Sequence, residues 1–252
     1  MKNIKLIITD LDDTLLRRDK TISGRTISAL SKCRQKGIKT AYATGRGGTS
    51  TTLVPSDLFD GYIRMNGATA HAGDELVYDK KMPAKTIKKV LLAVHNAGAK
   101  AAVESNGMHY SNFNVTAQWD IIKNYKIIDF NKIDFDAAKI YIIIENQKTI
   151  DIINANISEE MYFYNSRDNL AMVTHKDAIK SKGVAALMNY WGINKSEVIA
   201  FGDDTNDIDL LQICGTGVAM GNALDEVKAV ANQICDTNNN DGIAKWIEDN
   251  VI

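Results

Sequence analysis

Two aspartates, two positions apart, follow an apolar segment near the beginning of the sequence. Asp10 and Asp12 come directly after residues 4–9, which are nearly all apolar. Residues i and i+2 of an extended segment point the same way, so both carboxylates are expected to project into one site. Two carboxylates facing one point repel each other unless a cation lies between them, and several oxygens at one point suit Mg²⁺. The pair therefore predicts a divalent metal site.

Three other clusters have side chains that a phosphate ester would need. Thr44 and Gly45 offer a hydroxyl and a backbone amide for a phosphate oxygen. Lys182, followed by Gly183, would place a cation at the start of a helix. The segment GDDTND, residues 202–207, adds further carboxylates. Together the four clusters supply acids for a cation, a lysine, and donors for phosphate oxygens.

These groups meet the requirements of phosphate monoester hydrolysis, which is among the slowest reactions in water. A catalyst has to neutralise the charge of the phosphoryl group and align a nucleophile with it. A carboxylate can be that nucleophile, through an aspartyl-phosphate intermediate. Mg²⁺ and Lys182 would screen it from the anionic phosphoryl group.

The elements that must position these clusters alternate between strands and helices. Short β-branched runs over residues 4–9, 38–43 and 197–201 are separated by helical patterns, which is typical of a parallel α/β sheet. Open sheets of this kind bind ligands at the carboxyl ends of their strands, where the polar clusters stand. We expect a doubly wound, mostly parallel sheet.

The composition changes in the middle of the chain. From Pro83 onward a helical pattern and several short strands contain frequent Asn, Tyr and Phe, without phosphate-type loops. We predict an inserted α+β cap domain over residues 82–181 and a catalytic core formed by residues 1–81 and 182–252. The cap would close over a bound metabolite, exclude bulk water and supply specificity.

Four stretches with chemical side chains occur in a fixed order: ITDLDDTLL, YATGR, SKGVAAL and AFGDDTNDIDLL, with GVAMGNALDEVKAVA afterwards. In these stretches the sequence resembles the haloacid dehalogenase superfamily of phosphatases, specifically its Cof-type sugar-phosphatase branch. The stretches span nearly the whole chain, and the inserted segment lies where that branch carries its cap. The resemblance implies a Rossmann-like core and a Mg²⁺-dependent phosphatase that acts on small phosphorylated metabolites, above all sugar phosphates.

The resemblance also implies roles for the reacting residues. Asp10 would be the nucleophile and a metal ligand. Asp12 would protonate the leaving alkoxide and then activate water, with its backbone carbonyl on the metal. Thr44, Gly45 and Lys182 would hold the phosphoryl group.

Further roles fall on the third and fourth clusters. Asp203 would be a direct metal ligand and Asp207 a supporting one. Asn206 would reach the phosphate side, and Asn66 in MNGA matches a position at the substrate end of the site.

The sequence departs from the family pattern at two places. Asp13 stands where the family usually has Gly. The segment HKDAIKSKG is irregular, so Lys180 rivals Lys182, which we favour because it alone is followed by Gly. We interpret Arg46 as a surface cation or salt-bridge partner more readily than as a substrate ligand.

The composition excludes some partners. A formal net charge of −1 argues against nucleic acid, which would require a clustered basic excess. The longest apolar run beyond the N-terminal region, residues 140–144, is far too short to span a membrane. Three scattered cysteines are typical of a reduced intracellular protein. We expect a cytoplasmic monomer or small homo-oligomer.

Three other functions remain open at this point. A phosphomutase would use the same residues but return the phosphoryl group to a sugar. A phospho-accepting signalling module also gathers acids, Thr and Lys around an aspartate. Such modules are shorter, accept phosphate after the third strand, and lack the acid–base residue that Asp12 represents. A metabolite-binding protein without activity is the least favoured, because the motifs are intact.

Overall fold

The structure is a computed structural model that describes residues 3–105, 107–119, 122, 124–165 and 169–252. It divides into two compact units, Met1–Asp79 with Ile179–Ile252, and Lys80–Ala178. The boundaries predicted from the sequence lie slightly further along the chain, after residues 81 and 181. The shift matters at the second boundary, because it assigns Lys180 to the core unit instead of the cap.

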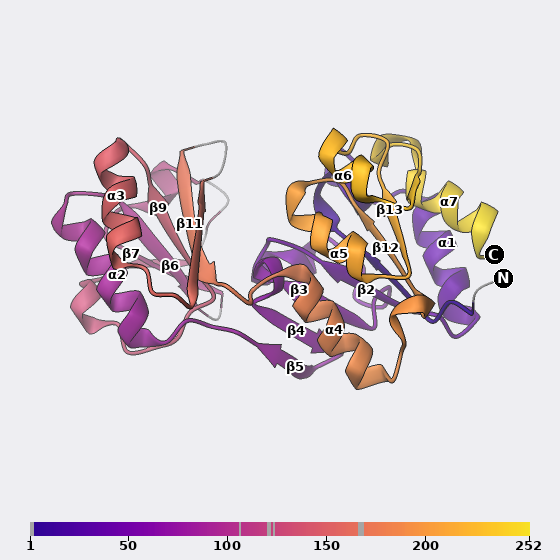
Figure 1. The fold of residues 1–252 in the computed structure, drawn as a ribbon, viewed down its shortest axis with the longest axis horizontal. Helices are drawn as coiled ribbons and strands as arrows, with labels where there is room; N and C mark the ends of the chain where they lie inside the picture. Colours follow the sequence, from indigo (N-terminus) through magenta and orange to yellow (C-terminus); the bar gives the residue numbers. More distant parts are fainter. Residues whose placement is uncertain (1–2, 106, 120–121, 123, 166–168) are drawn as a thin grey trace. The chain divides into compact units, whose positions relative to one another are not determined.

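The core unit is built on one sheet with the strand order β14-β13-β12-β1-β2-β3-β4-β5 (Figure 1). Strands β14 to β3 in this order are parallel, and β4 and β5 add an antiparallel edge. The strand bounds are β1 Leu6–Thr9, β2 Lys39–Ala43, β3 Gly61–Arg64, β4 Thr69–Ala72, β5 Glu75–Asp79, β12 Val198–Gly202, β13 Thr216–Ala219 and β14 Gln233–Ile234.

The central strand β1 shows why the sheet forms here. Leu6, Ile7 and Ile8 are all buried, as expected for a strand covered on both faces. Helices α1 and α7 pack together, while α5 contacts both α4 and α6, so the sheet is doubly wound. The helix bounds are α1 Gly24–Gln35, α4 Lys180–Trp191, α5 Ile208–Ile213, α6 Asp225–Val230 and α7 Gly242–Asn250. The predicted fold class is confirmed.

The second unit has its own sheet, with the order β10-β11-β9-β6-β7-β8, and two helices packed on it. Neighbouring strands are antiparallel except β7 and β8. The bounds are α2 Ala84–Asn96, β6 Ala101–Ser105, β7 Met108–Ser111, β8 Tyr125–Ile127, β9 Lys139–Ile143, α3 Gln147–Asn156, β10 Met161–Asn165 and β11 Leu170–His175. Alternate residues of the sheet, such as Val103, Ile140 and Ile142, join Leu91 of α2 in a separate apolar core.

Within the described residues, no helix has both the length and the apolar character that a membrane crossing requires.

Candidate active site

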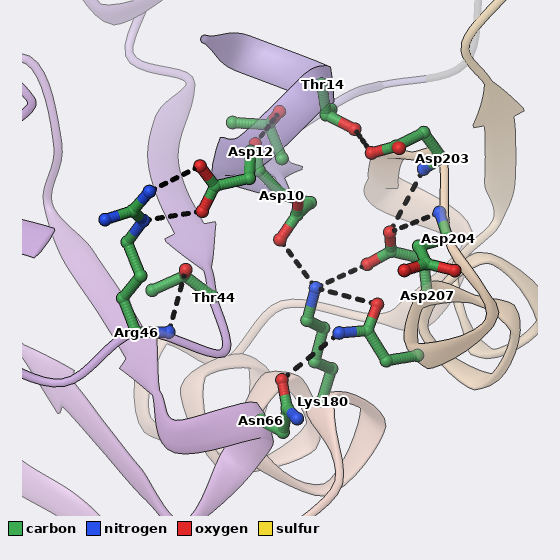
Figure 2. Close-up of polar contacts among 12 residues, drawn as sticks. Asp10, Asp12, Thr14, Thr44, Arg46, Asn66, Lys180, Asp203, Asp204 and Asp207 are labelled. Atoms are coloured by element: carbon green, nitrogen blue, oxygen red, sulfur yellow. Dashed lines mark hydrogen bonds and ion pairs between the residues drawn. The ribbon is translucent and has the colours of Figure 1, made fainter. Parts of the chain in front are cut away.

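Carboxylates from distant parts of the sequence meet at the carboxyl end of β1. Asp10 follows this strand, and its backbone N–H donates to the carbonyl of Phe201 in β12 at 3.0 Å. This pairing places Asp10 beside the loop that carries Asp203 and Asp207. One carboxylate oxygen from each of these three aspartates lies within 4.8 Å of the others (Figure 2). The parallel pairing of β1 with β12 is therefore what assembles the acidic cluster.

A buried lysine joins two of these carboxylates. Lys180 Nζ donates to Asp10 Oδ1 at 2.6 Å and to Asp207 Oδ1 at 2.7 Å (Figure 2). Burial by itself would lower the pKa of Lys180, but the charges of Asp10 and Asp207 outweigh it and hold that pKa above its ordinary value. Burial raises the pKa of Asp10 well above its ordinary value, although Lys180 acts in the opposite direction. Lys180 thus remains an ammonium ion inside the site.

The structure places Lys180, and not the predicted Lys182, beside Asp10. Lys182 is exposed, whereas the Lys180 side chain is completely buried. The prediction interpreted Gly183 as a sign of a helix start, but this glycine allows close packing against Ile63. A Cβ atom at position 183 would lie 2.8 Å from Ile63 Cγ2. Residues i and i+3 share a helix face, so the glycine that packs on the sheet indicates that Lys180 points inward. The three-residue spacing of Lys180 and Gly183 was therefore the sequence signal that favoured Lys180 over Lys182.

The loop after β12 fixes Asp207. Asp207 Oδ2 accepts hydrogen bonds from the backbone N–H groups of Asp203 and Asp204, at 3.0 and 3.2 Å. Gly202 permits this arrangement, since a Cβ atom there would lie 2.5 Å from Cβ of Asp207. One oxygen of Asp207 therefore holds the loop and the other holds Lys180.

Asp203 is held by a residue that the sequence reasoning did not single out. The hydroxyl of Thr14 donates to Asp203 Oδ1. Burial raises the pKa of Asp203 to about 7, against the effect of the Thr14 hydrogen bond, and the charge of Asp207 adds to the rise.

The donor set suits a divalent cation. Three carboxylates face one ammonium ion, so two negative charges in this cluster are left without a partner of opposite sign when all three are ionised. Hard oxygen donors in a small volume are the ligands that Mg²⁺ prefers. A divalent cation would also offset the burial and the neighbouring like charges that raise the pKa of Asp10 and Asp203. The residues present therefore fit the metal that the sequence predicts.

The expectation that Asp12 shares one direction with Asp10 is corrected by the structure. Arg46 donates from Nε to Asp12 Oδ2 at 2.6 Å and from Nη2 to Asp12 Oδ1 at 2.7 Å. Lys20 Nζ adds a third contact at 2.9 Å. Burial would raise the pKa of Asp12, but the hydrogen bonds from Arg46 and Lys20 outweigh it and bring that pKa below its ordinary value. Figure 2 shows the two carboxylates pointing to different partners.

The backbone after β1 explains why the directions diverge. Residues 11–15 form a tight turn, so the alternation of an extended strand ends at Asp10. Asp13 has φ +56°, in the left-handed region that glycine adopts without strain. Aspartate tolerates this region better than most residues, which accounts for its presence where the family usually has Gly. Asn222 Nδ2 donates to the Asp13 carbonyl at 2.7 Å and supports the turn.

The predicted phosphate-side residues form a series of contacts that starts at Lys180. Asn206 Oδ1 accepts from Lys180 Nζ at 3.5 Å, and Asn206 Nδ2 donates to Asn66 Oδ1 at 3.2 Å. Asn66 N–H donates to the carbonyl of Thr44 at 3.0 Å. Gly45 lies against the side-chain amide of Asn66, since a Cβ atom at position 45 would be 2.8 Å from Asn66 Oδ1. The structure thus brings these four residues to one end of the sheet.

The fold and the site together define a class: an α/β core with an inserted α+β cap, and acids and a lysine at the carboxyl ends of its parallel strands. The family of haloacid dehalogenase-like hydrolases matches residues 7–247, and the chain belongs to this family.

Individual relatives agree with this assignment. The 5-amino-6-(5-phospho-D-ribitylamino)uracil phosphatase YitU of Bacillus subtilis is 27% identical over 97% of this chain and 96% of its own. A second 5-amino-6-(5-phospho-D-ribitylamino)uracil phosphatase of Bacillus subtilis, YcsE, is 29% identical over 97% of this chain and 95% of its own. A solved sugar phosphatase of haloacid dehalogenase subclass IIB has a TM-score of 0.81 at 27% identity, covering 97% of this chain and 98% of that chain. The chain is a Cof-type phosphatase, a phosphoric monoester hydrolase.

Proposed function

We propose that this phosphatase hydrolyses phosphorylated sugars and related small phosphate esters through an aspartyl-phosphate on Asp10, with Mg²⁺ as cofactor. The observation that carries the proposal is the buried contact of Lys180 with Asp10 and Asp207, inside a cluster of three carboxylates. Such a cluster is costly to bury unless charge is neutralised when a ligand binds. It suits a site that receives a divalent cation and an anionic phosphoryl group.

The first step is transfer of the phosphoryl group to Asp10. A carboxylate oxygen of Asp10 attacks phosphorus, the ester P–O bond breaks, and Asp12 gives its proton to the departing alkoxide. Lys180 holds Asp10 in place and offers positive charge to the phosphoryl oxygens. Mg²⁺, held by Asp10, Asp203, Asp207 and the backbone carbonyl of Asp12, would neutralise charge on the phosphoryl group.

The second step releases phosphate. A water molecule attacks phosphorus and gives a proton to Asp12, which is now a carboxylate and acts as a base. The bond between Asp10 and phosphorus then breaks, and both side chains return to their starting states. Thr44, Gly45, Asn66 and Asn206 are proposed to bind the phosphoryl group or the adjacent part of the substrate, since Asn206 contacts Lys180, Asn66 contacts Asn206, and Thr44 and Gly45 lie against Asn66.

The names of the relatives support the substrate class. Two relatives from Bacillus subtilis are named for a phosphate ester on a ribityl chain, and one structural neighbour is described as a sugar phosphatase. We propose a polyhydroxylated phosphate monoester as the substrate of this chain as well. A cytoplasmic location is part of this proposal and accords with the free cysteines Cys33, Cys214 and Cys235.

Phosphate release from a panel of sugar phosphates, sugar-alcohol phosphates and other monoesters tests the proposal. Release is expected to stop with EDTA and to resume when Mg²⁺ is added in excess. Asp10→Asn is expected to abolish turnover while far-UV circular dichroism stays unchanged. Turnover that survives either treatment contradicts the mechanism. A requirement for a sugar bisphosphate activator would instead indicate a phosphomutase.

A further inference from the structure

The loop that follows β13 carries an asparagine that contacts the turn after β1. Asn222 Nδ2 donates to the carbonyl oxygen of Asp13 at 2.7 Å, and Asn222 Oδ1 accepts from the N–H of Asn238 at 2.9 Å. The side chain is exposed, but both ends of its amide are engaged. Because the amide is planar, it cannot rotate without losing both hydrogen bonds.

Asn238 extends this contact to the end of the turn. Its side chain is buried, and its Nδ2 donates to the carbonyl oxygen of Leu16 at 2.9 Å. The turn at residues 11–15 is thus held near its middle by Asn222 and just after its end by Asn238. The two asparagines stand 209 and 222 positions away from the residues they hold, so this restraint exists only in the folded chain.

The loop that carries Asn222 is itself fixed to the end of β12. Leu224 N–H donates to the carbonyl of Asp203 at 3.0 Å, and Met220 N–H donates to the carbonyl of Gly202 at 3.0 Å. Asn222 therefore connects the turn after β1 to the segment that carries Asp203, a proposed metal ligand.

The carbonyl that Asn222 holds belongs to a residue in an unfavourable conformation. Asp13 has φ +56° and ψ 8°, in the left-handed region. A residue other than glycine stays in this region where the surrounding structure restrains it. The hydrogen bond from Asn222 is such a restraint, because a different Asp13 conformation would carry the carbonyl away from Nδ2.

The conformation of Asp13 also sets the direction of the groups on either side of it. The Asp12 carbonyl, a proposed metal ligand, belongs to the peptide group that precedes Asp13. Thr14, whose hydroxyl donates to Asp203, follows Asp13 (Figure 2). Peptide groups are rigid, so rotation about the backbone bonds of Asp13 changes the angle between the Asp12 carbonyl and Thr14.

We propose that Asn222 is a positioning residue for the metal site. By holding the Asp13 carbonyl, it keeps the Asp12 carbonyl and Asp203 in the directions that a divalent cation needs. The inference rests on the proposed function, in which Mg²⁺ binds these two groups. Asn222 acts through the backbone of Asp13 and is not itself a ligand. Groups that orient metal ligands typically contribute ~10–100-fold to metal affinity.

Calorimetric titration of the metal-free protein with Mg²⁺ alone tests the inference without any substrate. Asn222→Ala should raise the dissociation constant of Mg²⁺ by ~10-fold, because the turn that orients the ligands loses its restraint. If Asn222→Ala does not fold, Asn222→Ser takes its place, since it also removes the amide donor. Urea unfolding in EDTA measures how much each variant loses in stability without metal.

Asn232 offers a matched control at the other end of β13. It is exposed like Asn222, and its Oδ1 accepts from Gly217 N–H at 2.7 Å near the start of the strand. Asn232→Ala should lower the urea midpoint in EDTA, as Asn222→Ala does, since both lose a hydrogen bond to the backbone. Its dissociation constant for Mg²⁺ should stay within about twofold of the wild-type value, because the metal site lies at the opposite end of the sheet.

Asp13→Gly distinguishes positioning from a general loss of structure. Glycine adopts positive φ without strain, so the turn should keep its shape with less help from Asn222. The loss of Mg²⁺ affinity caused by Asn222→Ala should therefore shrink to about threefold or less in the Asp13→Gly background, since the two residues are in contact and couple.

Three results would overturn the inference. Mg²⁺ affinity within about twofold of wild type in Asn222→Ala would show that the contact does not position the metal site. An equal loss in Asn232→Ala would assign the effect to lower stability. A loss of the same size with and without Asp13→Gly would show that Asn222 does not act through Asp13.

The titration also separates this inference from the proposed function. If the wild-type protein does not bind Mg²⁺, the proposed cofactor is wrong and the inference fails with it. If the wild type binds Mg²⁺ and Asn222→Ala binds it equally well, only the inference is wrong.

Discussion

The ammonium group of Lys180 lies 2.6 Å from Asp10 Oδ1, although the two residues are 170 positions apart in the sequence. The inserted unit Lys80–Ala178 separates the two residues in the sequence, but both belong to the core unit. It also decides between two lysines that the sequence could not separate reliably.

We expect Lys180→Ala and Lys182→Ala to differ sharply. Lys180→Ala leaves Asp10 and Asp207 buried without their cation, which should abolish phosphate release and destabilise the fold by about 3–5 kcal/mol. Lys182 is exposed, so its alanine variant should keep normal turnover and stability to within about 0.5 kcal/mol. Phosphate release and urea unfolding measure both effects. Similar losses in the two variants would contradict the assignment.

Metal-free protein should become less stable as the pH rises from 5 to 8. Burial raises the pKa of Asp203 to about 7 in the folded state, whereas an aspartate in the unfolded chain titrates near ~3.9. The folded state therefore binds a proton that the unfolded state has released, and this stabilisation disappears as the pH passes through about 7. The raised pKa of Asp10 acts in the same direction. The stabilisation that goes with the lowered pKa of Asp12 is lost only when the pH falls below this range.

Urea unfolding in EDTA at several pH values measures this dependence, with a decrease on the order of 2–4 kcal/mol expected across the range. Added Mg²⁺ should stabilise the protein more at pH 8 than at pH 5, since it competes with protons for the same oxygens. A metal-free protein with flat stability over this range would show that burial does not raise the pKa of these carboxylates as described.

Gly183→Ala tests the packing that aims Lys180 into the site. A Cβ atom at this position would lie 2.8, 3.1 and 3.2 Å from three side-chain atoms of Ile63, so we expect a loss of about 1–3 kcal/mol from overpacking. Turnover should fall as well, because α4 carries Lys180 and must shift. Gly24→Ala is the control: it lies in α1 with free space around the new methyl group, so it should stabilise by about 0.4–1 kcal/mol. Urea midpoints that rise for both variants would refute the packing argument.

The cysteines should react slowly in the folded protein. Burial raises the pKa of Cys33 to about 11 and those of Cys214 and Cys235 to about 12. Only a small fraction of each thiol is therefore the reactive thiolate at pH 8. We expect labelling with a disulfide reagent to be slow in buffer and fast in urea, where all three thiols become accessible. Fast labelling of Cys33 or Cys214 in the native protein would disprove the burial of that thiol.

Local sequence patterns were sufficient for the architecture. Apolar β-branched runs alternating with helical patterns indicate parallel strands, because strands covered on both faces exclude polar residues. The structure confirms this fold class, and the strands β1, β2 and β12 end next to the polar residues that the sequence singled out. Asp10 and Asp203 could be placed near each other because neighbouring parallel strands end at the same edge of a sheet.

Tertiary contacts decided the orientation of individual side chains. Which lysine enters the site depends on how α4 is rotated against Ile63, and the adjacent Gly183 was interpreted as a helix-terminus signal instead of a packing contact. Asp12 turns away from Asp10 because the turn at residues 11–15 ends the strand and Arg46 takes up its carboxylate. Thr14 reaches Asp203 across 189 positions. Local patterns set where elements begin and end, whereas a side chain takes its direction from partners that only the folded chain brings near.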